Sequence, residues 1–179
     1  MDTRSKIRGK YALCTIAVCL HIIFSVPVTA APGSPEGQMR PVRIGRLENG
    51  GLTLDVRLSV VKQALEQILG ERATLDGVTL FKTGGVSYLK ADGVQGKERV
   101  MIAVALTNEG ADLILRPDAL THLCVSTCGS CEYVLDIELH ISGCSCGSAA
   151  AVKRGASCAH TVRTDVAQKL ATLLQSGSI

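Results

Sequence analysis

The sequence has no tryptophan and few other aromatic residues. Aromatic side chains make up 3% of its 179 residues, which argues against a surface on which nucleic-acid bases stack. Most of the chain also lacks net charge. The sequence has 19 basic and 16 acidic residues, of which four basic and one acidic residue precede residue 30. The remainder of the chain therefore has 15 residues of each sign. Tight, non-specific binding to nucleic acid is therefore not expected, since it grows with the number of phosphates that basic side chains neutralise.

Sequence motifs of common enzyme classes are missing as well. The chain has no Gly-x-Ser-x-Gly, no dinucleotide-binding fingerprint and no His-Glu-x-x-His. Its four histidines leave few candidates for a base beside a nucleophile. We therefore expect a protein that is not an enzyme and that takes no small-molecule substrate.

Residues 1–30 are typical of a hydrophobic leader. A basic start precedes the largely apolar stretch Tyr11–Val28, and Val28-Thr29-Ala30 has the small-residue spacing of a signal-peptidase site. Such a leader predicts secretion into an oxidising compartment, where the six cysteines that follow would pair as disulfides. The alternative is an extended gene model, with a working protein that starts at Met39 in the nucleus or cytoplasm. Contact with a membrane is expected only if the leader is retained.

The chain after the leader alternates between strand and helix patterns. The stretches VRIGRL and LTLDVRL flank Asn49-Gly50-Gly51, which predicts a hairpin. Ser59 can cap a helix that ends at Gly70 and carries an apolar stripe for packing on the domain's own sheet. An antiparallel meander is expected next, because four β-rich runs are separated by Gly-Gly, Asp-Gly and Asn-Glu-Gly turns: VTLFK, VSYLKA, RVMIAVAL and ADLILR.

The C-terminal third is predicted to contain one strand and one helix around the cysteines. The stretch EYVLDIELHI alternates apolar and polar side chains as a strand does. Apolar residues from Val162 to Leu174 recur at helical spacing, and Ser157 can cap this helix. We expect an α+β fold with an antiparallel sheet or meander and a few helices. It would comprise an N-terminal region, residues 39–120, and a cysteine-rich region, residues 121–179.

Cys144, Cys146, Cys158 and His160 have the spacing C-x-C-x11-C-x-H. On a strand, residues two apart face the same way, so Cys144 and Cys146 can hold one metal ion together, while a disulfide between them is disfavoured. Cys158 and His160 are expected in the first turn of the terminal helix, where the positive end of the helix dipole favours a thiolate. Three sulfurs and one nitrogen suit a closed, structural zinc site.

This arrangement resembles the SWIM zinc finger, which is known from some chromatin-remodelling ATPases, transposases and small recombination proteins. The resemblance covers residues 132–174 and implies zinc ligation by these four residues in a strand–hairpin–helix fold. Ala159 stands where a basic residue or proline is common in the family, and no large ATPase or transposase domain accompanies the finger. In size and order the chain is similar to the small SWIM protein of Shu-type complexes. That similarity implies a RecA-type recombinase paralogue as partner in homologous recombination.

The segment from Cys144 onward carries the one basic concentration that follows the leader, with a net charge of +3 from four basic residues and Asp165. Lys153, Arg154, Arg163 and Lys169 are candidate contacts for DNA phosphates or for an acidic partner. A solvated helix face and loop explain the same pattern, so the two interpretations remain open.

A second cluster, His122, Cys124, Cys128 and Cys131, has the spacing H-x-C-x3-C-x2-C. Three thiols and an imidazole make it a candidate second zinc site. The same cysteines can instead be free core thiols, or a disulfide with one cysteine left over. The C-x-x-C from Cys128 to Cys131 also suggests a thiol oxidoreductase, although no thioredoxin-like pattern surrounds it.

The sequence as a whole predicts a non-enzymatic, zinc-binding interaction module of the nucleus or cytoplasm. Its expected role is that of an accessory factor in DNA recombination or repair, through contacts with a protein partner and with DNA. The alternative is a secreted binding protein stapled by disulfides. The two hypotheses use the same cysteines in incompatible ways, so the covalent state of the sulfur atoms separates them.

Overall fold

Ten strands and two helices form the described part of the chain, which comprises residues 39–48, 50–147 and 155–177 of a computed structural model. Strands dominate, and with two helices they confirm the predicted α+β fold. The strands are β1 (Val42–Glu48), β2 (Gly51–Leu54), β3 (Ala73–Thr83), β4 (Val86–Gln95), β5 (Glu98–Glu109), β6 (Asp112–Leu115), β7 (Thr121–Ser126), β8 (Cys131–Leu135), β9 (Ile141–Cys146) and β10 (Cys158–Arg163).

The predicted hairpin and meander are confirmed. β1 pairs with β2, and in the meander β3 pairs antiparallel with β4, β4 with β5, and β5 with β6. The turns between the meander strands contain Gly84, Gly85, Gly96 and Gly110, whose positive φ angles favour glycine. The predicted Asp-Gly turn is wrong, because Gly93 lies inside β4.

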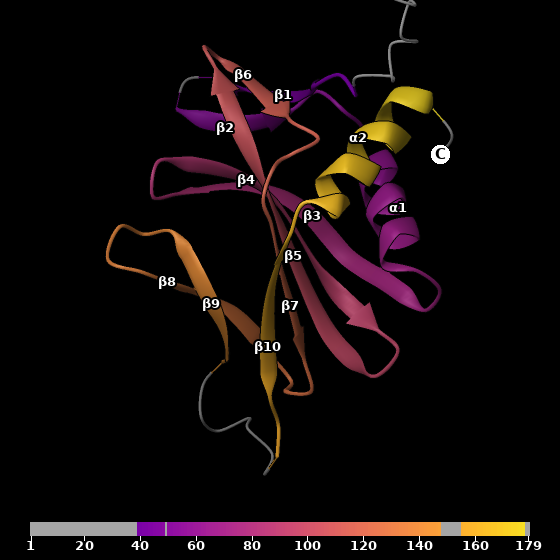
Figure 1. Ribbon diagram of the computed structural model, residues 1–179, viewed down its shortest axis with the longest axis vertical. Coiled ribbons are helices and arrows are strands. Elements are labelled where there is room, and N and C mark those ends of the chain that lie inside the picture. The colour runs from indigo at the N-terminus through magenta and orange to yellow at the C-terminus, as the bar shows by residue number, and fades with distance from the viewer. Residues whose placement is uncertain (1–38, 49, 148–154, 178–179) are drawn as a thin grey trace, which may run out of the picture. The chain divides into compact units, whose positions relative to one another are not determined.

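β5 joins both parts of the chain into one eight-stranded sheet. The sheet has the order β10-β7-β5-β6-β1-β2, with β4 paired to β5 and β3 paired to β4. Residues 99–104 of β5 pair with β7, and residues 107–109 pair with β6. Residues 39–120 and the cysteine-rich region therefore contribute strands to the same sheet (Figure 1).

Both helices lie on the same face of this sheet (Figure 1). α1 (Leu58–Leu69) contacts α2 (Asp165–Ser176) and β3, and α2 also contacts β1. The apolar stripe of α1 therefore packs on the domain's own sheet, as predicted. Burial of each large aliphatic side chain contributes about 1.5–3 kcal/mol. The core on this face includes Val61, Ala64, Leu65, Val100, Ile102, Val104, Val166, Ala167 and Leu170.

The ends of the two helices agree only partly with the prediction. Gly70 follows the last residue of α1 with φ 93°, and Gly177 follows α2 with φ 61°, as expected for glycine stops. Ser59 is not the cap of α1, because the helix begins one residue earlier, at Leu58. Arg57 precedes the helix, and its side chain makes no capping hydrogen bond.

A second, two-stranded sheet covers the opposite face of the main sheet. β8 and β9 pair with each other and pack over β4 and β5 through a cluster of Tyr88, Ala103 and Ile141. Along β5, Ala103 belongs to this cluster, whereas its neighbours Ile102 and Val104 belong to the helix side. This alternation is the two-residue period of a strand that is buried on both faces.

The stretch EYVLDIELHI is not the single strand that its alternation predicts. β8 ends at Leu135, β9 begins at Ile141, and a tight turn lies between them. Asp136 holds this turn, because its Oδ1 atom accepts hydrogen bonds of 2.9 Å from the backbone N–H groups of Glu138 and His140. A short acceptor side chain of this kind competes with the strand ladder for backbone donors.

Cys158 and His160 lie in a strand, and their predicted place in the first turn of the terminal helix is wrong. β10 pairs antiparallel with β7 over its whole length, and α2 begins only at Asp165. Ser157 is therefore not the cap of α2, since Thr164 precedes the helix. The open edge of β7 decides this outcome, because its backbone groups need partners and β10 supplies them.

Neither helix in the described residues has the length and apolar character needed to cross a bilayer. The described residues belong to one compact unit, which spans Gly37–Ile179. The leader predicted at residues 1–30 lies outside the described residues.

Candidate functional site

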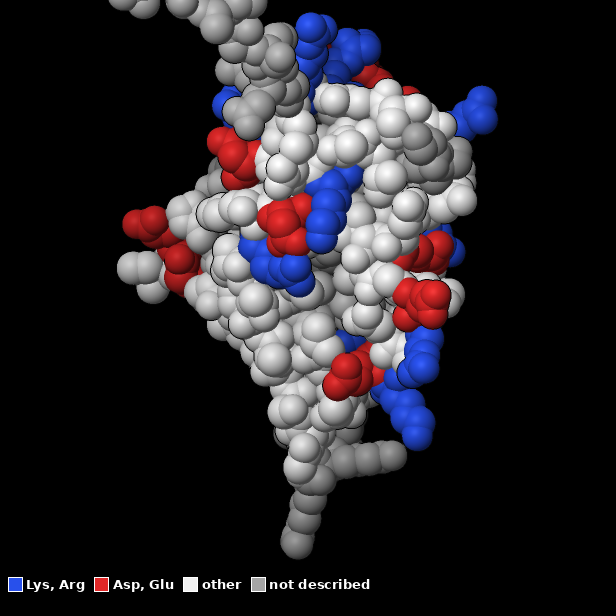
Figure 2. All heavy atoms as spheres, turned by 45° about the vertical axis from the view of Figure 1, so that its right-hand side comes forward, with Lys and Arg blue, Asp and Glu red and all other residues white. Residues whose placement is uncertain are grey.

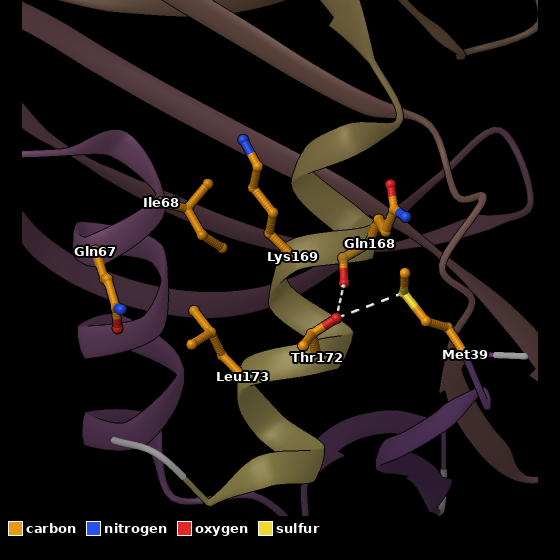
Figure 3. A pocket seen from close by; sticks show the side chains of 7 residues that line it. All are labelled: Met39, Gln67, Ile68, Gln168, Lys169, Thr172 and Leu173. Carbon is orange, nitrogen blue, oxygen red and sulfur yellow. Dashed lines mark hydrogen bonds between the residues drawn. The ribbon is translucent and has the colours of Figure 1, made fainter. Parts of the chain in front are cut away.

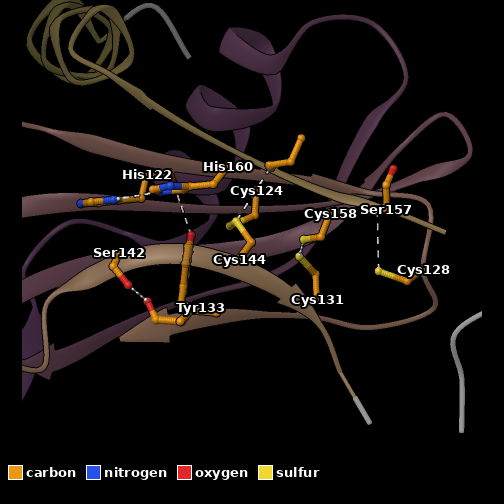
Figure 4. The surroundings of a disulfide bond; sticks show 12 residues. His122, Cys124, Cys128, Cys131, Tyr133, Ser142, Cys144, Ser157, Cys158 and His160 are labelled. Atoms are coloured by element: carbon orange, nitrogen blue, oxygen red, sulfur yellow. Dashed lines mark hydrogen bonds between the residues drawn. A yellow bond between two sulfur atoms is a disulfide. The ribbon is translucent and has the colours of Figure 1, made fainter. Parts of the chain in front are cut away.

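All eight predicted metal ligands gather between the main sheet and the small sheet. Figure 4 shows seven of them, and the eighth, Cys146, is bonded to Cys128. The two sets that appear separate in the sequence therefore form one site, called the cysteine–histidine layer below. The layer comprises His122, Cys124, Cys128, Cys131, Cys144, Cys146, Cys158 and His160.

Strand register places four members of the layer on the main sheet. His160 of β10 lies opposite Cys124 of β7, and residues two apart on a strand share a face. His122, Cys124, Cys158 and His160 therefore share one face. It is the face covered by the small sheet, because His122 lies opposite Ala103 of β5.

The hairpin of β8 and β9 supplies the other side of the layer. Cys131 is opposite Cys146, and Tyr133 is opposite Cys144. The same period of two therefore puts Cys144 and Cys146 on one face of the strand, as the sequence predicts. They are not bonded to each other, which also agrees with the prediction.

Two disulfides tie the small sheet to the main sheet. Cys124 of β7 is bonded to Cys144, and Cys128, in the connection after β7, is bonded to Cys146. Cys124 and Cys128 are buried, while their partners on β9 are half-buried. The sequence separations are 20 and 18 residues, so both bonds restrain the hairpin relative to β7 in the unfolded as well as the folded chain.

Cys131 and Cys158 form a third sulfur pair, which connects β8 to β10. Both are free thiols, and their Sγ atoms lie 2.7 Å apart, which is closer than van der Waals contact. Burial, followed by the interaction with Cys131, raises the pKa of the Cys158 thiol to about 12. The predicted activation of Cys158 as a thiolate is therefore wrong, because a strand position gives it no helix dipole.

His122 and His160 form the fourth pair. Their rings stack with centroids 5.4 Å apart, and Nδ1 of His122 lies 3.1 Å from Nε2 of His160. Burial lowers the pKa of His122, and the charge of the neighbouring His160 lowers this pKa further. The Tyr133 hydroxyl donates a hydrogen bond of 3.3 Å to the backbone carbonyl of His122, which places the histidine pair beside the hairpin.

Each of the four pairs takes one member from each predicted zinc set, so the structure does not bring either set of four together around one centre. Within the described ranges, one group of sulfur atoms lies close enough to hold a metal ion. It consists of Cys124, Cys131 and Cys144, whose Sγ atoms all lie within 4.8 Å of one another. Because Cys124 and Cys144 are bonded to each other, this disulfide and a metal ion are alternative states of the same sulfurs.

The sequence spacing identifies the residues of the layer but not which of them pair with each other. Spacing groups residues that are near one another in the chain, whereas strand pairing joins His122 to His160 across 38 residues. The even number of cysteines after the leader, three in each cluster, was the signal that favoured pairing. Cys128 and Cys131 of the C-x-x-C are likewise not bonded to each other, because Cys128 is bonded to Cys146.

The predicted DNA or partner contacts fall partly outside the described residues, where Lys153 and Arg154 lie. Arg163 and Lys169 both bind Asp165, at 2.7 and 3.1 Å. Hydrogen bonds from these two side chains lower the pKa of Asp165 to about 2. Figure 2 shows basic and acidic side chains next to one another on the face drawn, and not one basic patch.

A hollow of about 540 Å³ lies between the two helices (Figure 3). Ile68 of α1 and Leu173 of α2 give it apolar walls, and Lys169 is the charged side chain in its lining. The Thr172 hydroxyl donates a hydrogen bond of 2.9 Å to the Gln168 carbonyl, within α2. This hollow contains no cysteine or histidine in its lining. The reactive and metal-binding side chains lie instead in the cysteine–histidine layer, on the opposite face of the sheet.

Comparison of the chain with protein-family models, with curated proteins and with solved structures finds no match. The likeness to the SWIM zinc finger therefore rests on ligand spacing.

Proposed function

We propose that the chain is a non-enzymatic binding module of an oxidising compartment. Its small sheet is cross-linked to the main sheet and presents the turn between β8 and β9 to a protein partner. The observation that carries the proposal is the pairing of all six cysteines after residue 30 between neighbouring strands and connections. Disulfides persist in secreted proteins and are rare in a reducing cytosol.

Exposed apolar side chains on the turn support a binding role. Val134, Leu135, Ile137 and Leu139, called the hairpin tip below, are 40%, 40%, 100% and 56% exposed. Grouped apolar side chains on a surface mark interaction sites, whereas single ones do not. Burial of Ile137 by a partner would contribute about 1.5–3 kcal/mol, because this side chain buries no surface in its own chain.

The hairpin tip is held in one conformation before any partner binds. The Thr83 hydroxyl donates a hydrogen bond of 2.7 Å to the Leu139 carbonyl, and Nε2 of His140 lies 3.1 Å from the Gly84 carbonyl. Leu139 has φ 64°, a left-handed conformation that costs a non-glycine residue about 1–2 kcal/mol. Residues in such conformations are concentrated at functional sites, and a preorganised loop loses less entropy on binding.

The charges beside the tip indicate the chemistry of the partner. Asp136 and Glu138 flank Ile137 and are exposed, and Nδ1 of His140 lies 3.5 Å from Oε2 of Glu138. A protein with an apolar pocket bordered by lysine or arginine complements this surface. An anionic membrane surface would repel it.

The covalent part of the proposal is tested by intact mass. The full chain is purified without reductant and its mass is measured before and after alkylation of free thiols. Each disulfide removes about 2 Da and protects two cysteines from alkylation. Two or three disulfides among the six cysteines after residue 30 support the proposal, while alkylation of all six of these without prior reduction would overturn it.

The binding part is tested by photo-crosslinking in the cell that produces the chain. A photoreactive residue replaces Ile137, and a control places it at Leu58 of α1, which is 51% exposed. We expect a discrete protein adduct from position 137 and none from position 58. Glu138→Lys should weaken this adduct about tenfold or more, because it reverses the charge beside the tip. Equal adducts from both positions, a lipid adduct or a cross-linked dimer would each contradict the proposal.

Zinc binding by the reduced chain is a second candidate function, favoured by the group of Cys124, Cys131 and Cys144. Zinc–sulfur bonds of about 2.3 Å place the sulfurs of a tetrahedral site about 3.8 Å apart, which is within the 4.8 Å limit of this group. Metal analysis of the reduced chain tests it. Cys131→Ser should lower the zinc content, and the control Cys128→Ser should leave it unchanged. Equal zinc content in both variants would exclude this site.

An accessory role in DNA recombination, with a recombinase paralogue or DNA as partner in the nucleus or cytoplasm, remains a prediction from the ligand spacing. It requires reduced cysteines, so the mass measurement described above bears on it as well.

A further inference from the structure

One free thiol lies beside a disulfide within the cysteine–histidine layer. The Sγ atom of Cys131 is within 4.8 Å of both sulfurs of the Cys124–Cys144 disulfide. Thiol–disulfide exchange begins when a thiolate reaches one sulfur of a disulfide. A movement of about 1 Å brings sulfur atoms at this separation into van der Waals contact.

A second free thiol is in place to complete an exchange. Cys158 holds its Sγ atom 2.7 Å from that of Cys131, so four sulfurs form a continuous series from β10 through β8 to β7 and β9 (Figure 4). Cys131 and Cys158 are both half-buried, whereas Cys124 has no exposed surface. Cys144 is half-buried as well, so Cys124 is the one fully buried residue of the four.

We propose that the Cys131/Cys158 dithiol exchanges with the Cys124–Cys144 disulfide, so that the cross-link moves from β7–β9 to β8–β10. The inference rests on the cross-linked state in the proposed function and is independent of the partner.

The exchange balances within the chain. In the first step the Cys131 thiolate attacks Sγ of Cys124. A Cys124–Cys131 bond forms and Cys144 leaves as a thiolate. Cys144 is the favoured leaving sulfur because it is half-buried, whereas a thiolate on Cys124 would be fully buried.

In the second step the Cys158 thiolate attacks Sγ of Cys131. A Cys131–Cys158 bond forms and Cys124 leaves. The two protons released by Cys131 and Cys158 are taken up by the two departing sulfurs, and no external oxidant or reductant is consumed.

The Cys128–Cys146 disulfide stands outside this exchange. Its sulfurs do not belong to the close group formed by Cys124, Cys131 and Cys144 within the described residues. It keeps the hairpin attached while the other cross-link moves, which holds the reacting sulfurs at a high effective concentration. This bond therefore serves as an internal reference.

The experiment follows the position of the cross-links in the full chain. The chain is brought to two disulfides with a limiting amount of a small dithiol reductant and quenched with acid after different times. Free thiols are then alkylated, and cross-linked peptides are identified by mass spectrometry. We expect the Cys124–Cys144 peptide to decrease while the Cys131–Cys158 peptide appears, with the Cys128–Cys146 peptide constant.

A variant without the second nucleophile separates the two steps of the exchange. Its readout is the identity of the cross-linked peptides, which does not depend on the stability of the fold. Cys158→Ser should stop the exchange after the first step, so that a Cys124–Cys131 peptide accumulates and Cys144 becomes alkylated. Two disulfides whose partners never change would overturn this inference and leave the proposed function intact. A chain without disulfides would overturn both.

Discussion

Gly84 and His140 approach each other so closely that a methyl group on Gly84 would lie 2.5 Å from Cδ2 of the His140 ring. The turn between β3 and β4 thus has direct contact with the hairpin tip, and backbone carbonyls of Glu138 and Leu139 lie within 2.9 Å of the same point. The contact explains why a residue without a side chain occupies this position.

Gly84→Ala should destabilise the chain more than Gly85→Ala. Both glycines have positive φ, 54° and 76°, so each substitution costs about 1 kcal/mol through the backbone. Only at Gly84 would the new methyl group also meet His140, whereas a methyl group on Gly85 meets no atom within 4 Å. Urea unfolding of the two variants measures the difference, and equal losses would contradict the described contact.

Leu139→Gly should preserve or raise stability while it weakens partner binding. Glycine relieves the left-handed conformation at φ 64°, a gain of about 1 kcal/mol, but it removes an exposed apolar side chain of the tip. Leu135→Gly is the control, since this residue lies in β8, where glycine is expected to destabilise the strand. Thermal unfolding and photo-crosslinking of both variants check the prediction. A loss of stability in Leu139→Gly as large as that in the control would refute it.

Leu65→Ala should lower the free energy of unfolding by about 2–5 kcal/mol, because this α1 side chain is fully buried in the core between helices and sheet. The matched change Leu58→Ala, in the same helix but half exposed, should cost less than about 1 kcal/mol. Denaturant titration of the two variants compares them directly. Similar losses would mean that α1 does not pack on the sheet as described.

Asp165→Asn should alter the acid limb of the stability profile. The pKa of Asp165 is lowered from 3.8 to about 2 by Arg163 and Lys169, so the charged carboxylate stabilises the folded chain. This contribution is present above the ordinary pKa and is lost as the pH falls toward 2. Melting temperatures between about pH 5 and pH 2 should therefore fall less steeply in the variant.

The combination of Arg163→Gln and Lys169→Gln removes the two hydrogen-bond donors of Asp165 and should give the same flatter profile. An unchanged acid limb in both variants would show that these contacts do not persist in solution.

Local pattern predicted the elements whose partners are close in sequence. The strand alternation before and after Gly50 and the Gly84-Gly85 turn gave a hairpin and a meander, because each strand of these units pairs with its neighbour in the chain. The stripe of α1 and its stop at Gly70 follow from the helical period and from glycine's freedom at positive φ.

Tertiary pairing decided the elements that local pattern misjudged. Apolar alternation extends through Asp136, but the hydrogen bonds of its side chain turn the chain there. Cys158 and His160 precede an amphipathic helix by a few residues, yet the edge of β7 draws them into a strand. The spacing of cysteines in the sequence carries no information about which strand lies at that edge. The bonding partners of the sulfur atoms could therefore be identified only from the pairing of the strands.

The central position of β5 predicts that its backbone hydrogen bonds open less readily than those of the small sheet. This strand has neighbours along both edges and side chains buried on both faces, while the small sheet is joined to the main sheet by two disulfides and a small apolar cluster. Amide protons of β5 should be among the last to exchange with deuterated solvent, and those of the turn after Leu135 among the first. Cleavage of the sulfur bonds would then release the hairpin while the helix-covered half of the molecule retained its protected amides.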